Sequence, residues 1–403
     1  CKRPGRRPGF FVCSSLFRKG RLIFLPQVSV CQTESYDPAR MQAAVRAHFE
    51  ALDLSRQIRP DLKIVIKPNL VMKRAPEDAA TTHPALVEAV IRQLQQLGAQ
   101  DITIAESSGG PYAEPLLKSL YETCGMAEAA RRTGAKLNLG TGSREIGGNG
   151  QVTRRFTVID PIADADLILN LCKLKTHCMT VLSGAVKNLF GCIPGLMKPE
   201  LHMRYPEKED FCRMLLDLSA ALPPVISFVD AVEAMEGDGP TGGRKKHVGL
   251  TLCSADRYAL DLVNAAVLGI DPASIPTVRQ SIERGLCPAS LAQVQLLGDR
   301  DALTQAGPFL PPRSKQTDFS SQFPAPLRPA VKKVTRWLQP RPSIRRKDCI
   351  GCGKCAESCP AHTIRILERK AVIAYPNCIR CFCCHEMCPK QAVDIRRLGI
   401  FDL

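Results

Sequence analysis

The sequence predicts an α/β fold, with a mostly parallel sheet and helices on both faces, followed by a small α+β domain. Between residues 28 and 297, segments of strand length alternate with helical segments, a pattern typical of parallel sheets covered on both faces. Eight cysteines then recur in two regular runs near the C-terminus. With 403 residues, 45% of them hydrophobic, the chain can bury a large core and should form more than one domain.

The elements of the α/β part follow from local apolar patterns and turn residues. Leu86, Val90 and Leu94 share one face of a helix that Pro84 opens and Gly98 closes. Helices are predicted at residues 38–52, 84–97, 114–124, 182–190, 210–221 and 256–268. Strands are predicted at residues 28–32, 63–67, 101–105, 157–159, 166–170, 225–229, 248–253 and 294–297.

The net charge of +16 lies in two segments. Seven basic and no acidic residues fall in 1–25, and ten basic and one acidic in 306–347, so the rest of the chain is neutral. Such segments are typical of a solvated tail and linker, with a docking surface for an acidic partner or membrane headgroups as the alternative. We expect a basic, disordered extension at 1–25, an α/β domain at 26–305, a proline-rich basic linker at 306–342 and a cysteine-rich domain at 343–403.

The two cysteine runs share the spacing C-x2-C-x2-C-x3-C-P, which in proteins holds [4Fe-4S] clusters. Three thiolates two residues apart can wrap one face of a cluster, and the turn before the proline carries the fourth cysteine to the other cluster. The ligands of the two clusters should therefore cross. The first cluster is assigned to Cys349, Cys352, Cys355 and Cys388. The second is assigned to Cys378, Cys381, Cys384 and Cys359.

The remaining cysteines do not fit this spacing. Cys383 lies inside the second run and is expected to be a packed or hydrogen-bonding thiol rather than a ligand. Zinc is the alternative for paired cysteines, but two complete runs that each end in Cys-Pro argue against it. The runs and their surroundings, at about 343–397, resemble a two-cluster bacterial ferredoxin domain. This resemblance implies two [4Fe-4S] clusters that carry electrons.

Polar residues follow several predicted strands of the α/β domain, where open parallel sheets bind ligands. Lysines with glycine backbone amides would suit a phosphate or carboxylate, and clustered acids with a histidine could bind a divalent metal or move protons. The candidates for catalysis are Lys67, Lys173, Lys175, His177, Asp230 and Glu236. Further residues at this edge are Asn69, Glu106, Ser107, Ser108, Gly109, Gly110, Glu233 and Asp256.

Each of these signals has a structural alternative. The turn at 107–110 lacks a full Walker or dinucleotide pattern, so an ordinary tight turn is an equal alternative to a phosphate cradle. His83 could serve only beside the start of its helix. Lys187 and Asn188, between Gly184 and Gly191, could be structural as readily as ligand contacts.

Several separated motifs resemble the domain-of-unknown-function 362 family between about residues 28 and 298. They are Lys67-Pro-Asn69-Leu, Thr82-His83-Pro84, Asp261, the run from Lys173 to Gly191 and the run from Val229 to Gly243. Members often end in a two-cluster ferredoxin domain after a basic, proline-rich linker. The resemblance implies this architecture but no settled reaction.

Three functions remain open at this point. The first is an iron-sulfur oxidoreductase in which the clusters relay electrons to a ligand bound by the α/β domain. The second is a ferredoxin-like carrier whose α/β domain only docks a partner, and the third is a non-redox enzyme with structural clusters. A redox partner protein and an anionic or metal-bound small molecule are expected, whereas one Trp and six Tyr argue against nucleic acid.

The setting of the chain is expected to be the reducing cytoplasm. Eleven of the nineteen cysteines lie outside the two runs without the spacing of a disulfide framework. The N-terminal arginines could suggest a secretory signal, but the apolar stretch at 10–17 is short and interrupted by two serines. No stretch approaches the length of a transmembrane helix.

Overall fold

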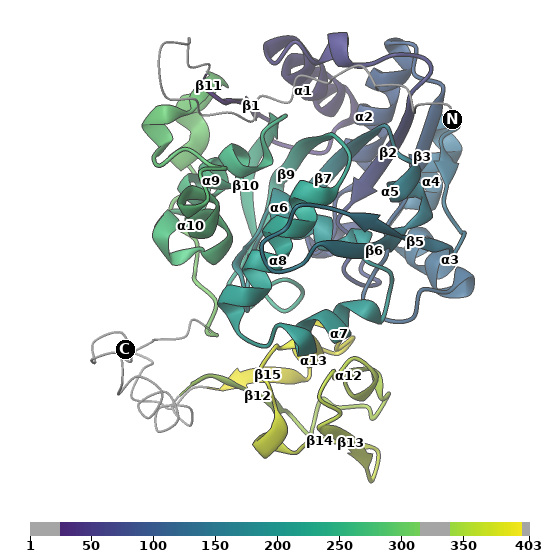
Figure 1. Ribbon diagram of the computed structural model, residues 1–403, viewed down its shortest axis with the longest axis vertical. Coiled ribbons are helices and arrows are strands. Elements are labelled where there is room, and N and C mark those ends of the chain that lie inside the picture. The colour runs from purple at the N-terminus through teal and green to yellow at the C-terminus, as the bar shows by residue number, and fades with distance from the viewer. Residues whose placement is uncertain (1–24, 315–338, 397–403) are drawn as a thin grey trace, which may run out of the picture.

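The computed structural model describes residues 25–314 and 339–396. Almost all of the extension predicted at 1–25, and residues 315–338 of the predicted linker, lie outside the described residues. The described chain forms a larger α/β body and a smaller C-terminal part, which lies below the body in Figure 1. We call this smaller part, residues 339–396, the cysteine module.

A nine-stranded sheet in the order β11-β1-β10-β9-β7-β2-β3-β4, with β8 paired to β7, forms the centre of the body. Neighbours are parallel from β9 to β4 and between β1 and β11, whereas β10 is antiparallel to β1 and β9. The predicted mostly parallel sheet is confirmed. The strands are β1 (Gln27–Gln32), β2 (Lys63–Pro68), β3 (Asp101–Ile104), β4 (Lys136–Leu137), β7 (Leu167–His177), β8 (Val181–Ser183), β9 (Val225–Glu236), β10 (Arg244–Ser254) and β11 (Gln295–Gly298).

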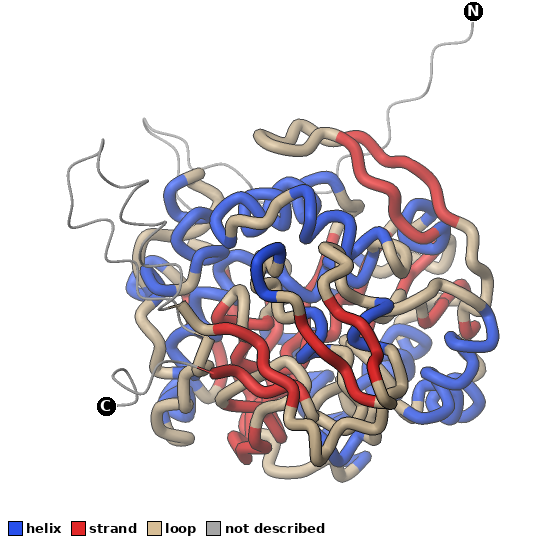
Figure 2. Tube along the Cα trace, turned by 90° about the horizontal axis from the view of Figure 1, so that it is seen from below, coloured by secondary structure: helices blue, strands red, loops and turns tan. Residues whose placement is uncertain are grey.

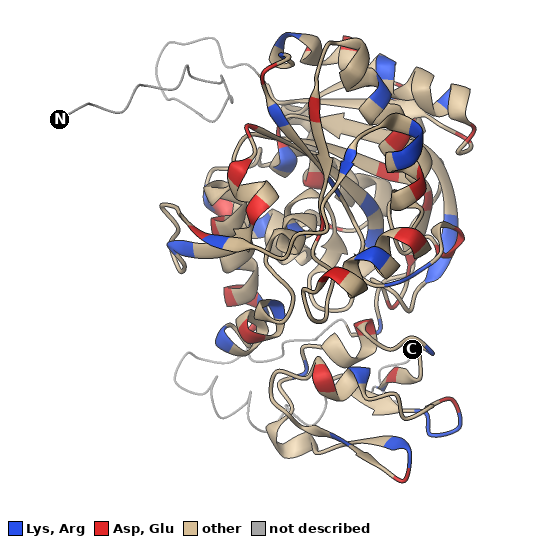
Figure 3. Ribbon diagram, turned by 90° about the vertical axis from the view of Figure 1, so that its right-hand side faces the viewer, with Lys and Arg blue, Asp and Glu red and all other residues tan. Residues whose placement is uncertain are grey.

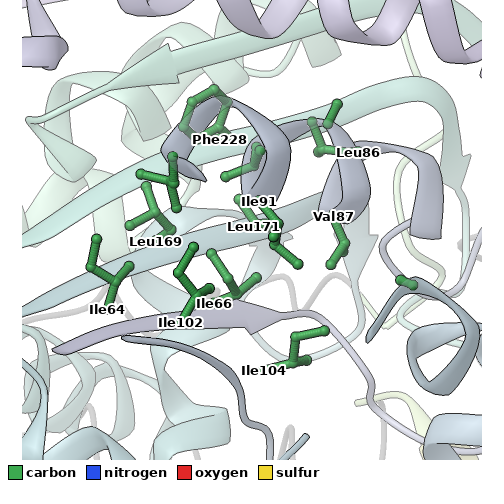
Figure 4. Close-up of a cluster of buried hydrophobic side chains, with 14 of the residues drawn as sticks. Ile64, Ile66, Leu86, Val87, Ile91, Ile102, Ile104, Leu169, Leu171 and Phe228 are labelled. Atoms are coloured by element: carbon green, nitrogen blue, oxygen red, sulfur yellow. The ribbon is translucent and has the colours of Figure 1, made fainter. Parts of the chain in front are cut away.

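Helices cover both faces of the sheet because side chains alternate along its strands. Ile64 and Ile66 of β2 join the core under α1 and α2, while Val65 joins the core under α8. Figure 4 shows Leu86 and Ile91 of α2 over these strands. The helices are α1 (Pro38–Ala51), α2 (Pro84–Gln96), α3 (Glu114–Thr123), α4 (Met126–Thr133), α5 (Asp160–Asp164), α6 (Ala185–Asn188), α7 (Met197–Arg204), α8 (Lys208–Ala221), α9 (Arg257–Leu268) and α10 (Pro276–Glu283).

Strands β7 and β9 are longer than predicted. The prediction ended them at residues 170 and 229, but they continue side by side to His177 and Glu236, with Lys173 paired to Asp230. All eleven residues of β7 are buried, including its lysines, because Asp230 of β9 binds Lys173 and the Asn69 amide oxygen binds Lys175. The predicted edge residues 173–177 and 230–236 therefore lie within strands rather than after them.

Two other predictions were wrong in detail. The predicted helix at 182–190 is divided into β8, the short α6 and a single 3-10 turn. Asp261 causes this break, since its carboxylate accepts hydrogen bonds from the backbone N–H groups of Ala185 and Val186 and so fixes where α6 starts. The strand predicted at 157–159 becomes β6 (Arg155–Ile159), which pairs with β5 (Ser143–Gly147) outside the main sheet.

The cysteine module consists of two similar halves. Each half contributes one short helix to the module, and Figure 2 shows the two strand pairs side by side at the front of the view. This small α+β arrangement agrees with the predicted ferredoxin-like domain. The elements are β12 (Arg341–Ile344), α12 (Lys354–Glu357), β13 (Ile364–Leu367), β14 (Lys370–Ile373), α13 (Cys383–Glu386) and β15 (Val393–Arg396).

No helix in the two described ranges is both long and apolar enough to cross a membrane.

Candidate functional site

A buried ion pair joins β7 to β9. The Nζ of Lys173 lies 2.7 Å from Oδ2 of Asp230, and neither side chain is exposed to water. Tyr36 donates its hydroxyl to Oδ1 of Asp230 at 2.7 Å, and the backbone N–H of His83 donates to Oδ2 at 2.9 Å. Asp230 therefore has the several donors that a buried carboxylate needs. The predicted candidates Lys173 and Asp230 satisfy one another, which favours a structural role.

A second buried ion pair lies between β2 and the loop after β3. The Nζ of Lys67 lies 2.6 Å from Oε2 of Glu106. Gly191 lies against this pair, and a Cβ at that position would stand 2.1 Å from Oε1 of Glu106. Only glycine lets the chain approach the pair so closely.

The glycine-rich loop after β3 is an ordinary turn rather than a free anion cradle. The backbone N–H of Ser107 donates to the Gly191 carbonyl, and that of Gly109 donates to the Val71 carbonyl, each at 3.2 Å. Lys198 of α7 lies over this loop, and its Nζ donates to Oγ of Ser107 at 3.1 Å. The loop amides are thus used within the protein, while a lysine that was not among the predicted candidates reaches the same place.

Lys175 starts a chain of buried amides. Its Nζ donates to Oδ1 of Asn69 at 2.6 Å, and the amide of Asn69 donates to Oδ1 of Asn188 at 2.7 Å. Asn188 in turn donates to Oδ1 of Asn170 at 2.8 Å, and Asn170 donates to Oγ of Ser227 at 3.1 Å. A lysine only donates, so its bond fixes the orientation of every amide after it. Lys175 has no carboxylate among its hydrogen-bond partners in the described chain.

His177, at the end of β7, faces the cysteine module. Its Nε2 lies 3.4 Å from Oε1 of Glu386, which belongs to α13. Neither atom has a hydrogen-bond partner among the described residues, although both are buried. Lys187 of α6 lies near enough for its charge to act on both groups. Its Nζ is 4.9 Å from the centre of the Phe190 ring and forms no ion pair or hydrogen bond within the described ranges.

Burial dominates the electrostatics of this region. It lowers the pKa of Lys175 to about 7, with repulsion from Lys173 and Lys187 as the next causes. It also lowers the pKa of Lys198 to about 7, although the negative charge of Glu106 opposes this shift. The pKa of His177 falls well below its usual value for the same reason, so this imidazole is neutral at pH 7. We call Lys67, Lys175, Lys187, Lys198 and His177 the lysine cluster; the nearby carboxylates are Glu106 and Glu386.

Other predicted residues do not join the lysine cluster. Glu236 binds the Arg244 side chain at 2.9 Å and the Leu310 backbone N–H at 3.0 Å. Glu233 pairs with His247. Asp256 accepts hydrogen bonds at the start of α9, and its role is that of a helix cap. Among the described residues, no three His, Cys, Asp or Glu side chains are close enough to share a single metal ion, so the predicted divalent metal site has no support here.

The four cysteines that the crossed assignment gives to the first cluster line one cavity of the module. Cys349, Cys352, Cys355 and Cys388 line this cavity together with apolar residues. The backbone N–H of Ala392 donates to Sγ of Cys388 at 3.1 Å, a contact that favours a thiolate. In a [4Fe-4S] cluster each thiolate binds a different iron, so the four sulfurs stand further apart than around one ion. The donor set therefore fits a cluster.

The second set lies next to the α/β body. Thr363 donates its backbone N–H to Sγ of Cys359 at 3.4 Å. Burial raises the pKa of Cys384 well above its usual value, and the charges of Cys381, Cys378, Cys355 and Cys359 add to this effect, so Cys384 lies near cysteines of both sets. The membership of the second set stays a prediction. Cys383 is buried beside Cys381.

The helix α13 attaches the module to the α/β body through three consecutive residues. His385 Nε2 lies 3.0 Å from the carbonyl oxygen of Asp238. Thr241 donates its hydroxyl to the backbone carbonyl of Glu386 at 2.9 Å. Met387 lies on Gly109, where an added Cβ would stand 2.6 Å from its sulfur. These residues lie between Cys384 and Cys388, so the loop between these two cysteines contacts the body directly.

Comparisons with known proteins give the family. Residues 64–266 match the family described as Domain of unknown function (DUF362), and residues 341–389 match a 4Fe-4S dicluster domain. A thylakoid-associated protein of Synechocystis sp. is 31% identical over 265 residues, which cover 65% of this chain and 81% of that protein. The chain belongs to the DUF362 family. The predicted family and its C-terminal iron-sulfur domain are thus confirmed.

The similarity of this DUF362 protein to a solved structure is too low to support a functional argument. A solved structure of a Thermotoga maritima protein matches with a TM-score of 0.31 and 12% identity, and the match covers 52% of this chain and 55% of that chain.

Sequence reasoning missed four residues of the site in this DUF362 protein. Lys198 lies on α7, a helix that was not predicted, because 197–204 has weak amphipathic character. Tyr36 precedes α1 in an ordinary-looking turn. Glu386 and Met387 belong to the second cysteine run. Met387 differs from Ser358 at the same place in the first run, which was an available signal, whereas Glu386 matches Glu357 and gave none.

Proposed function

We propose that this DUF362 protein transfers electrons through two [4Fe-4S] clusters to an anionic small molecule held at the lysine cluster. One observation carries the proposal. The loop between two cysteines assigned as ligands, Cys384 and Cys388, contacts the α/β body where Lys175, Lys187 and His177 gather. A module that only carried electrons between other proteins would have no need of such a contact.

The charges of the lysine cluster support an anionic ligand. Four lysines face two carboxylates, and among the described residues Lys175 and Lys187 have no carboxylate within ion-pair distance. A buried cation that lacks a carboxylate partner is costly, and a bound anion would reduce this cost. The neutral His177, with a free Nε2, is a group that can exchange a proton with such a ligand.

Each cluster, when bound, would supply one electron, and two electrons together with two protons complete an ordinary reduction of an organic ligand. A reduced partner protein would be the electron donor and would be oxidised in turn. The lysine cluster would bind and orient the ligand, and α13 would keep water from the path between the cysteines and the ligand.

The partner would contact the outer face of the cysteine module. Ile350 and Leu367 are 52% and 55% exposed there, and Cys352 is exposed between them and Lys354. Figure 3 shows Lys and Arg residues at the ends of the hairpins on this part of the chain. An apolar patch with a basic rim next to the first set of cysteines suits an acidic electron-transfer protein.

The proposed compartment is a reducing one, with the cytoplasm as our prediction. The cysteines buried in the α/β body form no disulfide within the described residues. The name of the Synechocystis relative associates it with the thylakoid.

The test separates a coupled enzyme from a simple carrier. The full chain is purified anaerobically, small molecules are released by acid and identified by mass spectrometry, and each is added back to dithionite-reduced protein. We expect one compound to reoxidise the clusters, as followed by their visible absorption. Protein that is reversibly reduced but retains no such compound would favour the carrier that the sequence leaves open.

The variant Gly242→Val makes the test specific. A Cβ at Gly242 would stand 2.7 Å from the imidazole of His385, so the larger side chain should push α13 away from the body. Iron content should stay normal while reoxidation slows. Gly147→Val is the control, because a Cβ at Gly147 meets no atom within 4 Å.

A further inference from the structure

Two equivalent glutamates of the cysteine module have different surroundings. Glu357 follows Cys355 by two positions, and Glu386 follows Cys384 by two positions. Glu357 is exposed, as expected for a carboxylate on a short surface helix. The Glu386 side chain is only 14% exposed, and it lies against His177 of the α/β body. Glu357 thus serves as an internal reference, and Glu386 differs from it in being mostly buried.

The surroundings of Glu386 are those of a bound anion rather than of a finished ion pair. Its Oε1 lies 3.4 Å from Nε2 of His177, and both atoms lack a hydrogen-bond partner among the described residues. The charges of Lys187 and Lys175 act on this carboxylate, but neither lysine is within ion-pair distance of it in the described ranges. Burying a carboxylate oxygen without a hydrogen bond is unfavourable. The positive charges around Oε1 offset part of this cost.

The groups that surround the Glu386 carboxylate belong to the α/β body and not to the cysteine module. His177 is 1% exposed, and its Nδ1 accepts the backbone N–H of Met179 at 3.0 Å, so its free Nε2 is directed by the fold. His202 of α7, 4% exposed, is also near Lys187 and also has a nitrogen without a partner among the described residues. The cations and the free nitrogens would remain in place if Glu386 moved away.

We propose that the place now filled by the Glu386 carboxylate, between His177 and Lys187, is a subsite for the carboxylate group of a small-molecule ligand. Glu386 occupies the subsite in the ligand-free chain, and the ligand carboxylate displaces it. This inference deepens the proposed function and rests on its ligand-binding half, since it names the class of the bound molecule.

Displacement of Glu386 by the ligand should also affect the nearby cysteines. Glu386 lies two residues from Cys384 and two from Cys388, so its release would move the loop between them. A carboxylate ligand should therefore alter the environment of the second set of cysteines, whereas a ligand bound elsewhere would not.

Equilibrium dialysis with radiolabelled oxalate tests the subsite on the full, cluster-loaded chain. The variant Glu386→Gln removes the competing charge at constant size, and Glu386→Ala also removes the side chain. Both should bind oxalate more tightly than the wild type, by roughly tenfold if the internal carboxylate fills the subsite most of the time. The matched control Glu357→Gln, at the equivalent exposed place, should bind like the wild type.

Two further variants remove the partners of the ligand. Lys187→Met and His177→Ala should each abolish oxalate binding, with iron content as the check that the module is intact. Inorganic phosphate is the competing probe. Oxalate affinity that is the same in wild type and both Glu386 variants would overturn the proposal, and so would binding of phosphate but not oxalate.

One alternative has its own signature. If Lys187 serves only to balance the charge of the nearby cysteines, Lys187→Met would shift a cluster reduction potential and leave oxalate binding unchanged, which would contradict the subsite. Binding is measured at equilibrium without turnover. A failure here would therefore leave the electron-transfer proposal standing, and its own test is reoxidation.

Discussion

Lys67 and Glu106 form an ion pair of 2.6 Å that is almost completely removed from water. The single variants Lys67→Met and Glu106→Gln each leave one buried group without its partner. We expect each to cost about 3–5 kcal/mol of stability and the double variant to cost much less, because most of the loss comes from the uncompensated charge. The thermal midpoint of the α/β domain measures this.

The control for this pair is on the surface. Lys136 and Asp101 lie 2.9 Å apart but are 67% and 39% exposed, so Lys136→Met should change the midpoint little. Single and double variants at Lys67 and Glu106 with additive effects would contradict the expected coupling.

The binding of oxalate should depend on pH through Lys175. Below pH 7 this lysine is charged in the empty and in the occupied site. Above pH 7 the empty site loses the proton, while a bound anion holds it, so affinity should fall as the pH rises, by at most tenfold per unit. Binding should also take up a proton at pH 8. Calorimetry in two buffers of different ionisation enthalpy measures this uptake.

Lys198 is the check on that assignment, because its pKa is also lowered to about 7. Lys198 lies further from Glu386 than Lys175 does. Lys175→Met should therefore remove a larger part of the proton uptake than Lys198→Met. Uptake that is unchanged in both variants would assign the proton to another group.

The crossed cysteine assignment predicts unexpected pairings among single variants. Cys359→Ser, in the first run, should remove the same cluster as Cys381→Ser, in the second run. Cys388→Ser should resemble Cys352→Ser. Electron paramagnetic resonance of the reduced protein identifies which cluster remains, and Cys383→Ser should keep both. If variants in the same cysteine run lose the same cluster signal, the ligands do not cross.

Removal of iron should loosen the contact between module and body. The three contacting residues lie on a loop whose shape depends on Cys384 and Cys388, so a chelator should expose the backbone amides around Cys178 and Thr241. Hydrogen exchange measures this, with β2 and β3 as internal controls that should not change. Equal protection with and without iron would mean that the loop is held by the body alone.

The sequence predicted the architecture well because its signals are local. Alternating residues place Ile64 and Ile66 on one face and Val65 on the other, and cysteine spacing alone defines the module. The strand ends at 170 and 229 were wrong for a physical reason. Lys173 and Asp230 look like edge residues singly, but as a pair they can be buried within strands, and a pair 57 residues apart has no local signal.

The candidate site was only partly predictable. Lys67, Lys175 and His177 belong to the lysine cluster, and their catalytic role stays a prediction. Lys173 and Asp230 bind one another, and Glu236 binds Arg244. Lys198 and Glu386 reach the site from distant elements, and only tertiary packing brings them there. The residue type alone does not show whether a lysine is buried or exposed, so the burial of these charges could not be predicted from the sequence.

Each amide oxygen in the chain accepts a hydrogen bond from the group before it: Asn69 from Lys175, Asn188 from Asn69, and Asn170 from Asn188. Their dipoles therefore add, as peptide dipoles do along a helix, and the negative end of the sum meets the ammonium group. The chain of neutral amides thus takes the place that a carboxylate would fill beside an ordinary buried lysine. The interior can hold a cation there without a resident counterion, and the field of that cation stays available to a visiting molecule.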